Sequence, residues 1–204
     1  MTDKREIILE NVLRLIQILM AKSEQHTKKI CEDNDQEAVK SLLKILEGPG
    51  LKNTSYSTKI ILFVLNILRQ MIRHSFKAKA TILKNKNEEN NKSSLSVIAD
   101  MVKPENQKVL QKEHRILEMC IYQFFGEFVM EENEYKRVVG GLMFDKIFHV
   151  RIKGILTERE EELEEYIVPP LTGEIEEQFF KLMSILTRNN PENAQHVKNM
   201  RFDL

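Results

Sequence analysis

The sequence FFKLMSILTRNNPENAQHVKNM, residues 179–200, predicts one helix, a sharp corner and the start of a second helix. In its first half, apolar residues recur at the spacing of one broad helical face. Asn190 and Pro191 then separate the two helices, because Asn is a favoured N-cap and Pro fits the first position of a new helix. The second helix is expected to carry Val197 and Met200 inward.

The same pattern recurs three times upstream. The apolar position Leu186 aligns with three earlier residues, at successive spacings of 57, 57 and 53: Val129, Ile72 and Leu19. The corner residue Asn190 then corresponds to Asn133, Phe76 (with Ser75 beside it) and Ser23. The anchor Val197 corresponds to Gly140 (with Val139 beside it), Leu83 and Ile30. A near-constant period of this kind is typical of stacked helical repeats, whose units bury their apolar faces only against neighbours.

We therefore predict an all-α protein, with one domain over residues 1–204 built as a helical solenoid of about four units. The expected units are 1–54, 55–103, 104–172 and 173–204, the last of them incomplete. The alternative is a plain helical bundle.

Several local features follow from the same pattern. The first helix should have an apolar stripe made of Ile7, Ile8, Val12, Leu15, Ile16 and Leu19. The helix from about residue 58 is the richest in apolar residues and should lie in the middle of the stack. Gly140 and Gly141 are expected to turn the chain, and residues 84–96 to form a mobile surface loop.

Charge and cysteine content exclude several classes of function. The 204 residues include 31 basic and 31 acidic side chains, so the formal net charge is zero. That balance gives no overall electrostatic case for a nucleic acid or an anionic membrane as partner. Cys31 and Cys120 are too few for a disulfide or zinc framework, and we expect both to be small buried residues.

The sequence contains no recognisable targeting or membrane segment. MTDKREIILE, at the N-terminus, lacks the basic-then-apolar layout of a secretory signal. The longest apolar run, Ile60 to Leu68, is interrupted by Asn66 and is far shorter than the roughly 18 residues that span a bilayer. We therefore expect a cytoplasmic protein without membrane insertion.

The turn sequence KLMSILTRNNPENAQHV at 181–197 resembles the armadillo repeat, of which the HEAT repeat is a close relative. The glycine pair 140–141 and the segment SLLKIL at 41–46 resemble other parts of that repeat. This resemblance implies an armadillo-like right-handed solenoid that binds its partners along a groove. More weakly, the corner N-x-x-N after L-x-x-L also resembles the helical solenoid repeats of inositol trisphosphate and ryanodine receptors, which would imply a cytosolic part of a channel.

Importin-type armadillo proteins bind extended peptides with a repeated Asn and with a Trp one turn earlier. The Asn row falls here on Gln17, Gln70, Glu127 and Ser184. The Trp row falls on Leu13, Asn66, Gln123 and Phe180, and the chain has no Trp. The first row nevertheless remains polar in every unit, so its side chains could still bond a partner backbone. The alternative is that this row simply faces solvent.

Two charged stretches are candidate contacts. A basic patch between residues 69 and 92 opposes only Glu88 and Glu89, and consists of Arg69, Arg73, Lys77, Lys79, Lys84, Lys86 and Lys92. It could hold an acidic peptide, a phosphate or a nucleic acid, although Phe76 is its only aromatic residue. An acidic helix is predicted at 157–167 and could meet a basic partner. In both cases the alternative is a solvated surface.

No sequence motif indicates a catalytic, phosphate-binding or metal-binding site. A glycine-rich phosphate loop, a nucleophile elbow and a zinc-protease helix are missing from the sequence. The five histidines lack metal-ligand spacing: His26, His74, His114, His149 and His196. We expect no catalytic, cofactor-binding or metal site, and no small-molecule substrate.

The expected function is a non-catalytic adaptor or scaffold whose groove binds a peptide or helix of a partner protein. The groove candidates are Gln17, Asn66, Gln70, Gln123, Glu127, Phe180 and Ser184. The alternative is a structural subunit of a large cytoskeletal, ciliary or channel-associated assembly. It would dock, or self-associate, through an open C-terminal end formed by Val197, Met200 and Phe202. Nucleic-acid binding through the basic patch is a third hypothesis.

Overall fold

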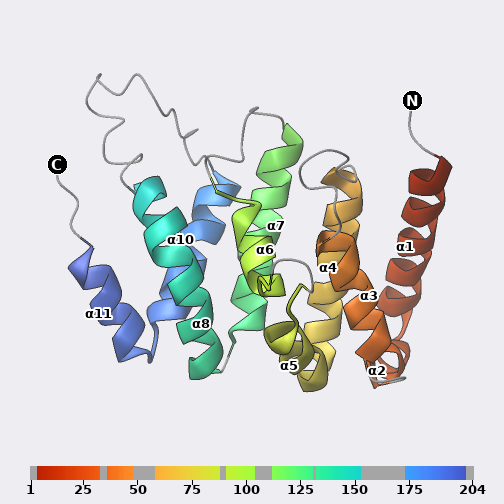
Figure 1. The fold of residues 1–204 in the computed structure, drawn as a ribbon, viewed down its shortest axis with the longest axis horizontal. Helices are drawn as coiled ribbons and strands as arrows, with labels where there is room; N and C mark the ends of the chain where they lie inside the picture. The colour runs from red at the N-terminus through yellow and green to blue at the C-terminus, as the bar shows by residue number, and fades with distance from the viewer. Residues whose placement is uncertain are drawn as a thin grey trace. The chain divides into compact units, whose positions relative to one another are not determined.

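The structure is a computed structural model that describes residues 4–32, 36–47, 58–87, 91–103, 112–130, 132–152 and 173–200. Within these ranges the regular elements are helices, accompanied by one isolated bridge, so the all-α prediction is confirmed (Figure 1). Two compact units, Met1–Ile98 and Ala99–Leu204, divide the chain and are described separately. The predicted acidic helix at 157–167 and Phe202 lie outside the described residues.

The N-terminal unit contains five complete helices and the start of a sixth. They are α1 (Lys4–Lys22), α2 (Glu24–Glu32), α3 (Glu37–Glu47), α4 (Thr58–His74), α5 (Phe76–Lys84) and α6 (Ser94–Asp100), which crosses into the second unit. Helix α4 is the centre of this unit, since it packs against α1, α2, α3 and α5. Eight of its side chains are buried, from Ile60 to Ile72, as its apolar content predicts.

Single serines form the two corners of this unit. Ser23 separates α1 from α2, and its Oγ accepts a hydrogen bond from His26 N at 3.2 Å. Ser75 separates α4 from α5 and accepts from Ala78 N, also at 3.2 Å. Each serine therefore caps the following helix. Phe76 is the first residue of α5 and is exposed, so the corner lies at Ser75 rather than Phe76.

Part of the polar segment after α5 forms a hydrogen-bonded turn. Asn87 N donates to Lys92 O at 2.8 Å, and Ser94 N donates to Asn85 O at 3.2 Å. The side chain of Asn85 also donates to Glu47 Oε1 at 3.0 Å, which ties this turn to the end of α3. Helix α6 then begins at Ser94, inside the stretch that was predicted as loop.

Apart from helical residues at 149–152, the described part of the C-terminal unit contains two pairs of helices and one π-helical turn. They are α7 (Lys112–Phe128), α8 (Asn133–Met143), η4 (Phe144–Phe148), α10 (Glu174–Thr187) and α11 (Pro191–Asn199). Helix α10 packs against α7, α8 and α11. Aromatic rings fill the space between them, with Phe179 in edge-to-face contact with Tyr122 and Phe148 at centroid distances of 5.8 and 4.8 Å.

The predicted helix corner at Asn190 and Pro191 is confirmed. Asn190 Oδ1 accepts a hydrogen bond from Asn193 N at 2.9 Å, and Pro191 occupies the first turn of α11. Asn190 Nδ2 also donates to Asn133 O at 3.2 Å, and Asn193 Nδ2 donates to Lys136 O at 2.9 Å. Both bonds join residues 57 positions apart, the spacing that the sequence pattern assigns to these two corners.

The predicted turn at Gly140 and Gly141 is wrong, because both glycines lie inside α8. A Cβ at Gly140 would lie 2.7 Å from Asn193 Oδ1 and 2.8 Å from the Phe144 ring. Gly140 is therefore there for close packing against α11, and not to break the helix. The corner before α8 also differs by one residue, since Glu132 rather than Asn133 holds the N-cap position.

Candidate interaction surface

Helix α1 carries an exposed apolar face along most of its length. Only Leu13 and Met20 are fully buried in this helix. Six large apolar side chains are between 45% and 63% exposed: Ile7, Ile8, Val12, Leu15, Ile18 and Leu19. Among the described residues of its unit, α1 has its main helix contacts with α4 and α2, and no other described helix of that unit packs extensively on this face.

The apolar stripe predicted for α1 is not the face by which this helix packs against its unit. Of the six residues predicted for the stripe, only Ile16 is half-buried, and the other five are exposed: Ile7, Ile8, Val12, Leu15 and Leu19. The physical reason is that apolar residues occur almost all the way round this helix. Packing against α4 and α2 selects the side that carries Leu13 and Met20, and leaves a second apolar side outside.

The exposed residues form two parallel rows. Ile8, Val12, Leu15 and Leu19 follow one another at steps of four, three and four residues, the spacing of a coiled-coil seam. We call these four residues the α1 seam. The second row is Ile7, Asn11, Arg14, Ile18 and Lys22, all exposed. Together the rows make a face suited to another helix, since knobs from a partner can fit between them.

The charges on this face are basic. The exposed charged residues of α1 are Lys4, Arg5, Arg14 and Lys22. The two acidic residues, Glu6 and Glu10, are half-buried. Glu10 Oε1 lies 2.6 Å from Lys59 Nζ on α4 and 3.0 Å from Arg14 Nη2.

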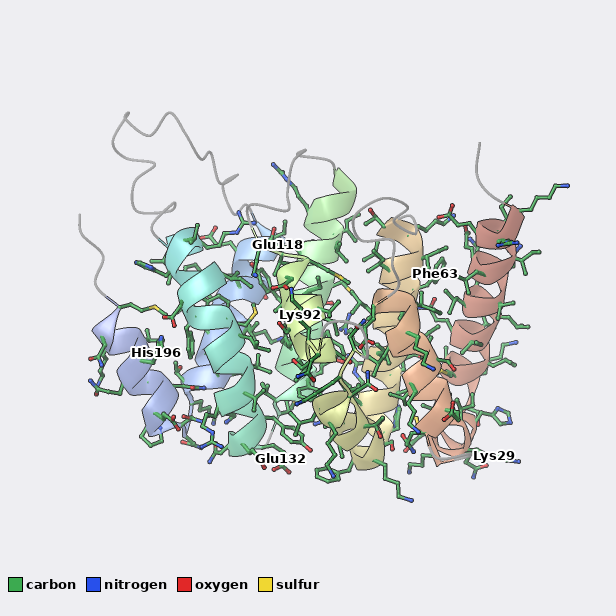
Figure 2. All side chains as sticks on the ribbon, viewed as in Figure 1. Lys29, Phe63, Lys92, Glu118, Glu132 and His196 are labelled. Atoms are coloured by element: carbon green, nitrogen blue, oxygen red, sulfur yellow. The ribbon has the colours of Figure 1, made fainter. Side chains whose placement is uncertain are left out.

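Two neighbouring side chains, Glu10 and Phe63, hold the Arg14 guanidinium in place. Its guanidinium carbon lies 5.8 Å from the ring centroid of Phe63, which Figure 2 labels on α4, and its Nη2 bonds Glu10. The Arg14 side chain is nevertheless 53% exposed. A planar guanidinium has five N–H donors, so this arrangement leaves Arg14 able to bond a carboxylate that approaches the α1 seam.

The predicted groove residues lie on helices of both units. In the N-terminal unit, Gln17 lies on α1, and Asn66 and Gln70 lie on α4; all three are half-buried. Asn66 Oδ1 accepts from Arg69 Nη1 at 3.4 Å. The Oε1 atom of Gln70 is buried and has no hydrogen-bond partner among the described residues. Leu13, which the alignment puts level with Asn66, is only 2% exposed and belongs to the core.

In the C-terminal unit, the groove candidates form two pairs, and the two members of each pair lie one helical turn apart on the same helix. Gln123 and Glu127 are half-buried on α7, whereas Phe180 and Ser184 are exposed on α10. These helices pack closely, since a Cβ at Gly126 would lie 3.6 Å from Ile185 Cδ1. The structure therefore brings these four residues onto one pair of packed helices.

The basic patch lies on the last turns of α4, on α5 and on the turn that follows. Arg69 and Lys79 are half-buried, and the other members are exposed: Arg73, Lys77, Lys84, Lys86 and Lys92, of which Figure 2 labels Lys92. At the C-terminal end, Val197 and Met200 are half-buried on and just after α11. Binding at either place stays a prediction.

A buried ion pair is the polar feature that the sequence did not reveal. Arg151 Nη2 lies 2.8 Å from Glu118 Oε1, and the Tyr122 hydroxyl donates to the same oxygen at 2.6 Å. Burial, with the nearby Glu118 charge, raises the pKa of Tyr122 well above its ordinary value. Since these residues are at most 4% exposed, the cluster fixes α7, on which Figure 2 labels Glu118, against the helical segment at residues 149–152 that contains Arg151.

His196 takes part in a surface contact between two elements. His196 Nε2 lies 2.7 Å from Asp145 Oδ1, and its ring stacks on Phe144 at a centroid distance of 5.3 Å. This contact attaches α11 to η4, and Figure 2 labels His196 there. Among the described residues, no three His, Cys, Asp or Glu side chains converge as metal ligands would.

Cys31 and Cys120 are both buried, as expected. No helix in the described part of the chain has the length and apolar character that a membrane crossing requires. In comparisons with known proteins, no family model, curated protein or solved structure matches the chain. Its function is therefore argued from the geometry of its own residues.

Proposed function

We propose that the protein is a non-catalytic interaction module, an adaptor or scaffold that binds a helix of a partner protein. The observation that carries this proposal is the exposed apolar face of α1. Among the described residues, six of the eleven large apolar side chains that are strongly exposed lie on this one helix. The other five are scattered singly over other elements, which is ordinary for a protein surface.

The size of this face suits a reversible contact. Fully burying a Leu or Ile side chain contributes about 1.5–3 kcal/mol. The six exposed side chains of α1 each have about half of their surface still open to solvent. Covering them with a partner therefore contributes on the order of 5–9 kcal/mol. Association itself costs roughly 4–15 kcal/mol, so the apolar face alone gives weak binding. Charges around the face and anchors on the partner must supply the rest.

An armadillo-like solenoid of about four units is the architecture that we propose for the module. It is supported by four successions of a long helix and a shorter one, with N-cap residues Ser23, Ser75, Glu132 and Asn190 between them. It is also supported by the hydrogen bonds that join residues 57 positions apart in the second unit.

The test is affinity capture from native cell extract with three variants beside the wild type. Ile8→Glu/Leu15→Glu alters the α1 seam, Gln70→Ala/Glu127→Ala alters the predicted groove row, and Ile116→Glu alters a single exposed apolar residue of α7. The proposal expects a stoichiometric partner that the seam variant loses and the other two retain. A partner lost only with the groove variant would move the site to that row, and equal retention by all variants would contradict the proposal.

A second candidate function is that of a structural subunit docked through its C-terminal end. It is favoured by the incomplete burial of Val197 and Met200 at that end. Met200→Glu should then release the chain from a set of large proteins, whereas the α1 seam variant should not.

A further inference from the structure

We propose that the occupant of the α1 face is an amphipathic helix from a partner protein, with an apolar seam flanked by acidic side chains. This inference rests on the proposed function and adds the chemistry of the partner. It is argued from the spacing of the exposed residues and from the sign of the charges beside them.

The spacing selects a helix as the occupant. The α1 seam repeats at four, three and four residues, which matches a helix lying nearly parallel to α1 and does not match the two-residue period of a strand. Helix α1 has 19 residues and is therefore about 28 Å long. A partner helix of about three heptads would contact the whole seam.

The charges select acidic flanks on that helix. Lys4 and Arg5 lie at one end of the face, Lys22 at the other, and Arg14 between Ile7 and Ile18 in the second row. Glutamates at the flanking positions of a partner seam would meet these cations, as interhelical charge pairs do in coiled coils. Arg14 should be the central contact, because Glu10 and Phe63 hold it in position.

A second copy of this chain is a poor occupant for the same reason. If two α1 helices packed antiparallel through their seams, Arg5 of one copy would oppose Lys22 of the other. If they packed in parallel, Arg5 would lie beside Arg5 and Lys22 beside Lys22, because both residues continue the seam at its two ends. Either arrangement brings like charges together beside an apolar contact, which disfavours self-association.

An anionic membrane would also match an apolar face with basic residues. The chain as a whole carries no net charge, with 31 basic and 31 acidic residues, so it has little long-range attraction to such a surface. The basic excess is local to the face, which suits short-range pairing with carboxylates on a partner helix. A lipid surface is therefore kept as an outcome of the test.

The experiment uses two synthetic helical peptides of three heptads with leucine at both seam positions. One peptide has glutamate at the flanking positions, and the other has lysine there. Each is labelled and titrated with the full chain at low salt, with fluorescence anisotropy as readout. The Glu-flanked peptide should bind at least tenfold more tightly than the Lys-flanked one. Ile8→Glu/Leu15→Glu should weaken its binding at least tenfold, and Ile116→Glu should not.

Arg14→Glu tests the charge argument separately, because it leaves the seam intact. This variant should reduce the preference for the Glu-flanked peptide, whereas a purely apolar contact would leave it unchanged. The two wild-type titrations decide the sign of the preference even if a seam variant fails to fold. Circular dichroism of each variant shows whether its helices are retained.

The remaining outcomes separate this inference from the proposed function. Equal or tighter binding of the Lys-flanked peptide, lost in the seam variant, overturns the acidic partner but leaves a helix-binding module. A dimer in sedimentation that the seam variant abolishes points to a second copy, and seam-dependent binding to phosphatidylserine vesicles without peptide binding points to a membrane; each overturns the inference. Failure of both peptides, together with a partner capture that the seam variant does not change, overturns both proposals.

Discussion

Asn193 on α11 donates a hydrogen bond to the main-chain oxygen of Lys136 on α8, at 2.9 Å, and packs directly against Gly140. Its amide nitrogen also lies 2.9 Å from Leu186 O, so one buried side chain joins three helices. This arrangement makes a glycine necessary at position 140, because a Cβ there would meet Asn193. At the neighbouring Gly141 the space around an added Cβ is open, so a larger residue would fit.

Gly140→Ala should destabilise the protein by about 1–3 kcal/mol, because the new Cβ would overlap the Asn193 amide and the Phe144 ring. Gly141→Ala is the matched control, and should stabilise by about 0.5–1 kcal/mol because alanine favours the helix interior. Urea unfolding of both variants measures these changes. Equal effects at the two positions would show that α11 does not pack on Gly140.

The register of the second corner gives a further prediction. Ser75→Ala should cost about 1 kcal/mol, because it removes the acceptor that caps α5. Phe76→Ser should leave the free energy of unfolding almost unchanged, since its side chain is exposed. Thermal unfolding of the two variants places the cap, and no loss at Ser75 together with a gain at Phe76 would place it one residue later, because serine is a better N-cap than phenylalanine.

Breaking the buried pair should be costly. Glu118→Ala leaves the Arg151 charge buried without its carboxylate, and we expect a loss of about 3–5 kcal/mol. The exposed pair of Lys40 and Glu37 serves as control, because Glu37→Ala should change stability by no more than about 1 kcal/mol. Chemical denaturation measures both. Similar small effects would mean that Glu118 is solvated in solution.

Tyr122 predicts a pH dependence in the alkaline range. Its pKa is raised in the folded chain, so above pH about 10 the unfolded chain loses the phenol proton first. The folded state then holds more protons than the unfolded state, and stability falls as pH rises, by up to about 1.4 kcal/mol per pH unit from this group. Tyr122→Phe should flatten this decline. An unchanged slope between pH 10 and 11 would contradict the burial of the hydroxyl.

Much of the fold could be predicted because it rests on local signals. The serine and asparagine corners, the apolar helix α4 and the 57-residue spacing of the last two corners follow from capping chemistry and helical periodicity. The pairing of Glu118 with Arg151 could not be predicted, since it joins residues 33 positions apart that share no local pattern.

The candidate site was missed for a different reason. Ile7, Ile8, Val12, Leu15 and Leu19 were found as a stripe, but α1 also has apolar residues on its opposite side. Periodicity within one helix cannot say which of two apolar sides packs, because that choice depends on α4 and α2. Gly140 was misassigned similarly, since a glycine that makes room for Asn193 looks in sequence like a helix end.

The most direct test of the central claim is the environment of Leu15 when a partner helix is present. Leu15→Cys, labelled with a polarity-sensitive fluorophore, should be reactive while Cys31 and Cys120 stay protected by burial. Adding the Glu-flanked peptide should shift its emission to the blue, and the same label at Ile116→Cys should not respond. Bound peptide with no change at position 15 would show that the α1 face is not the interaction surface.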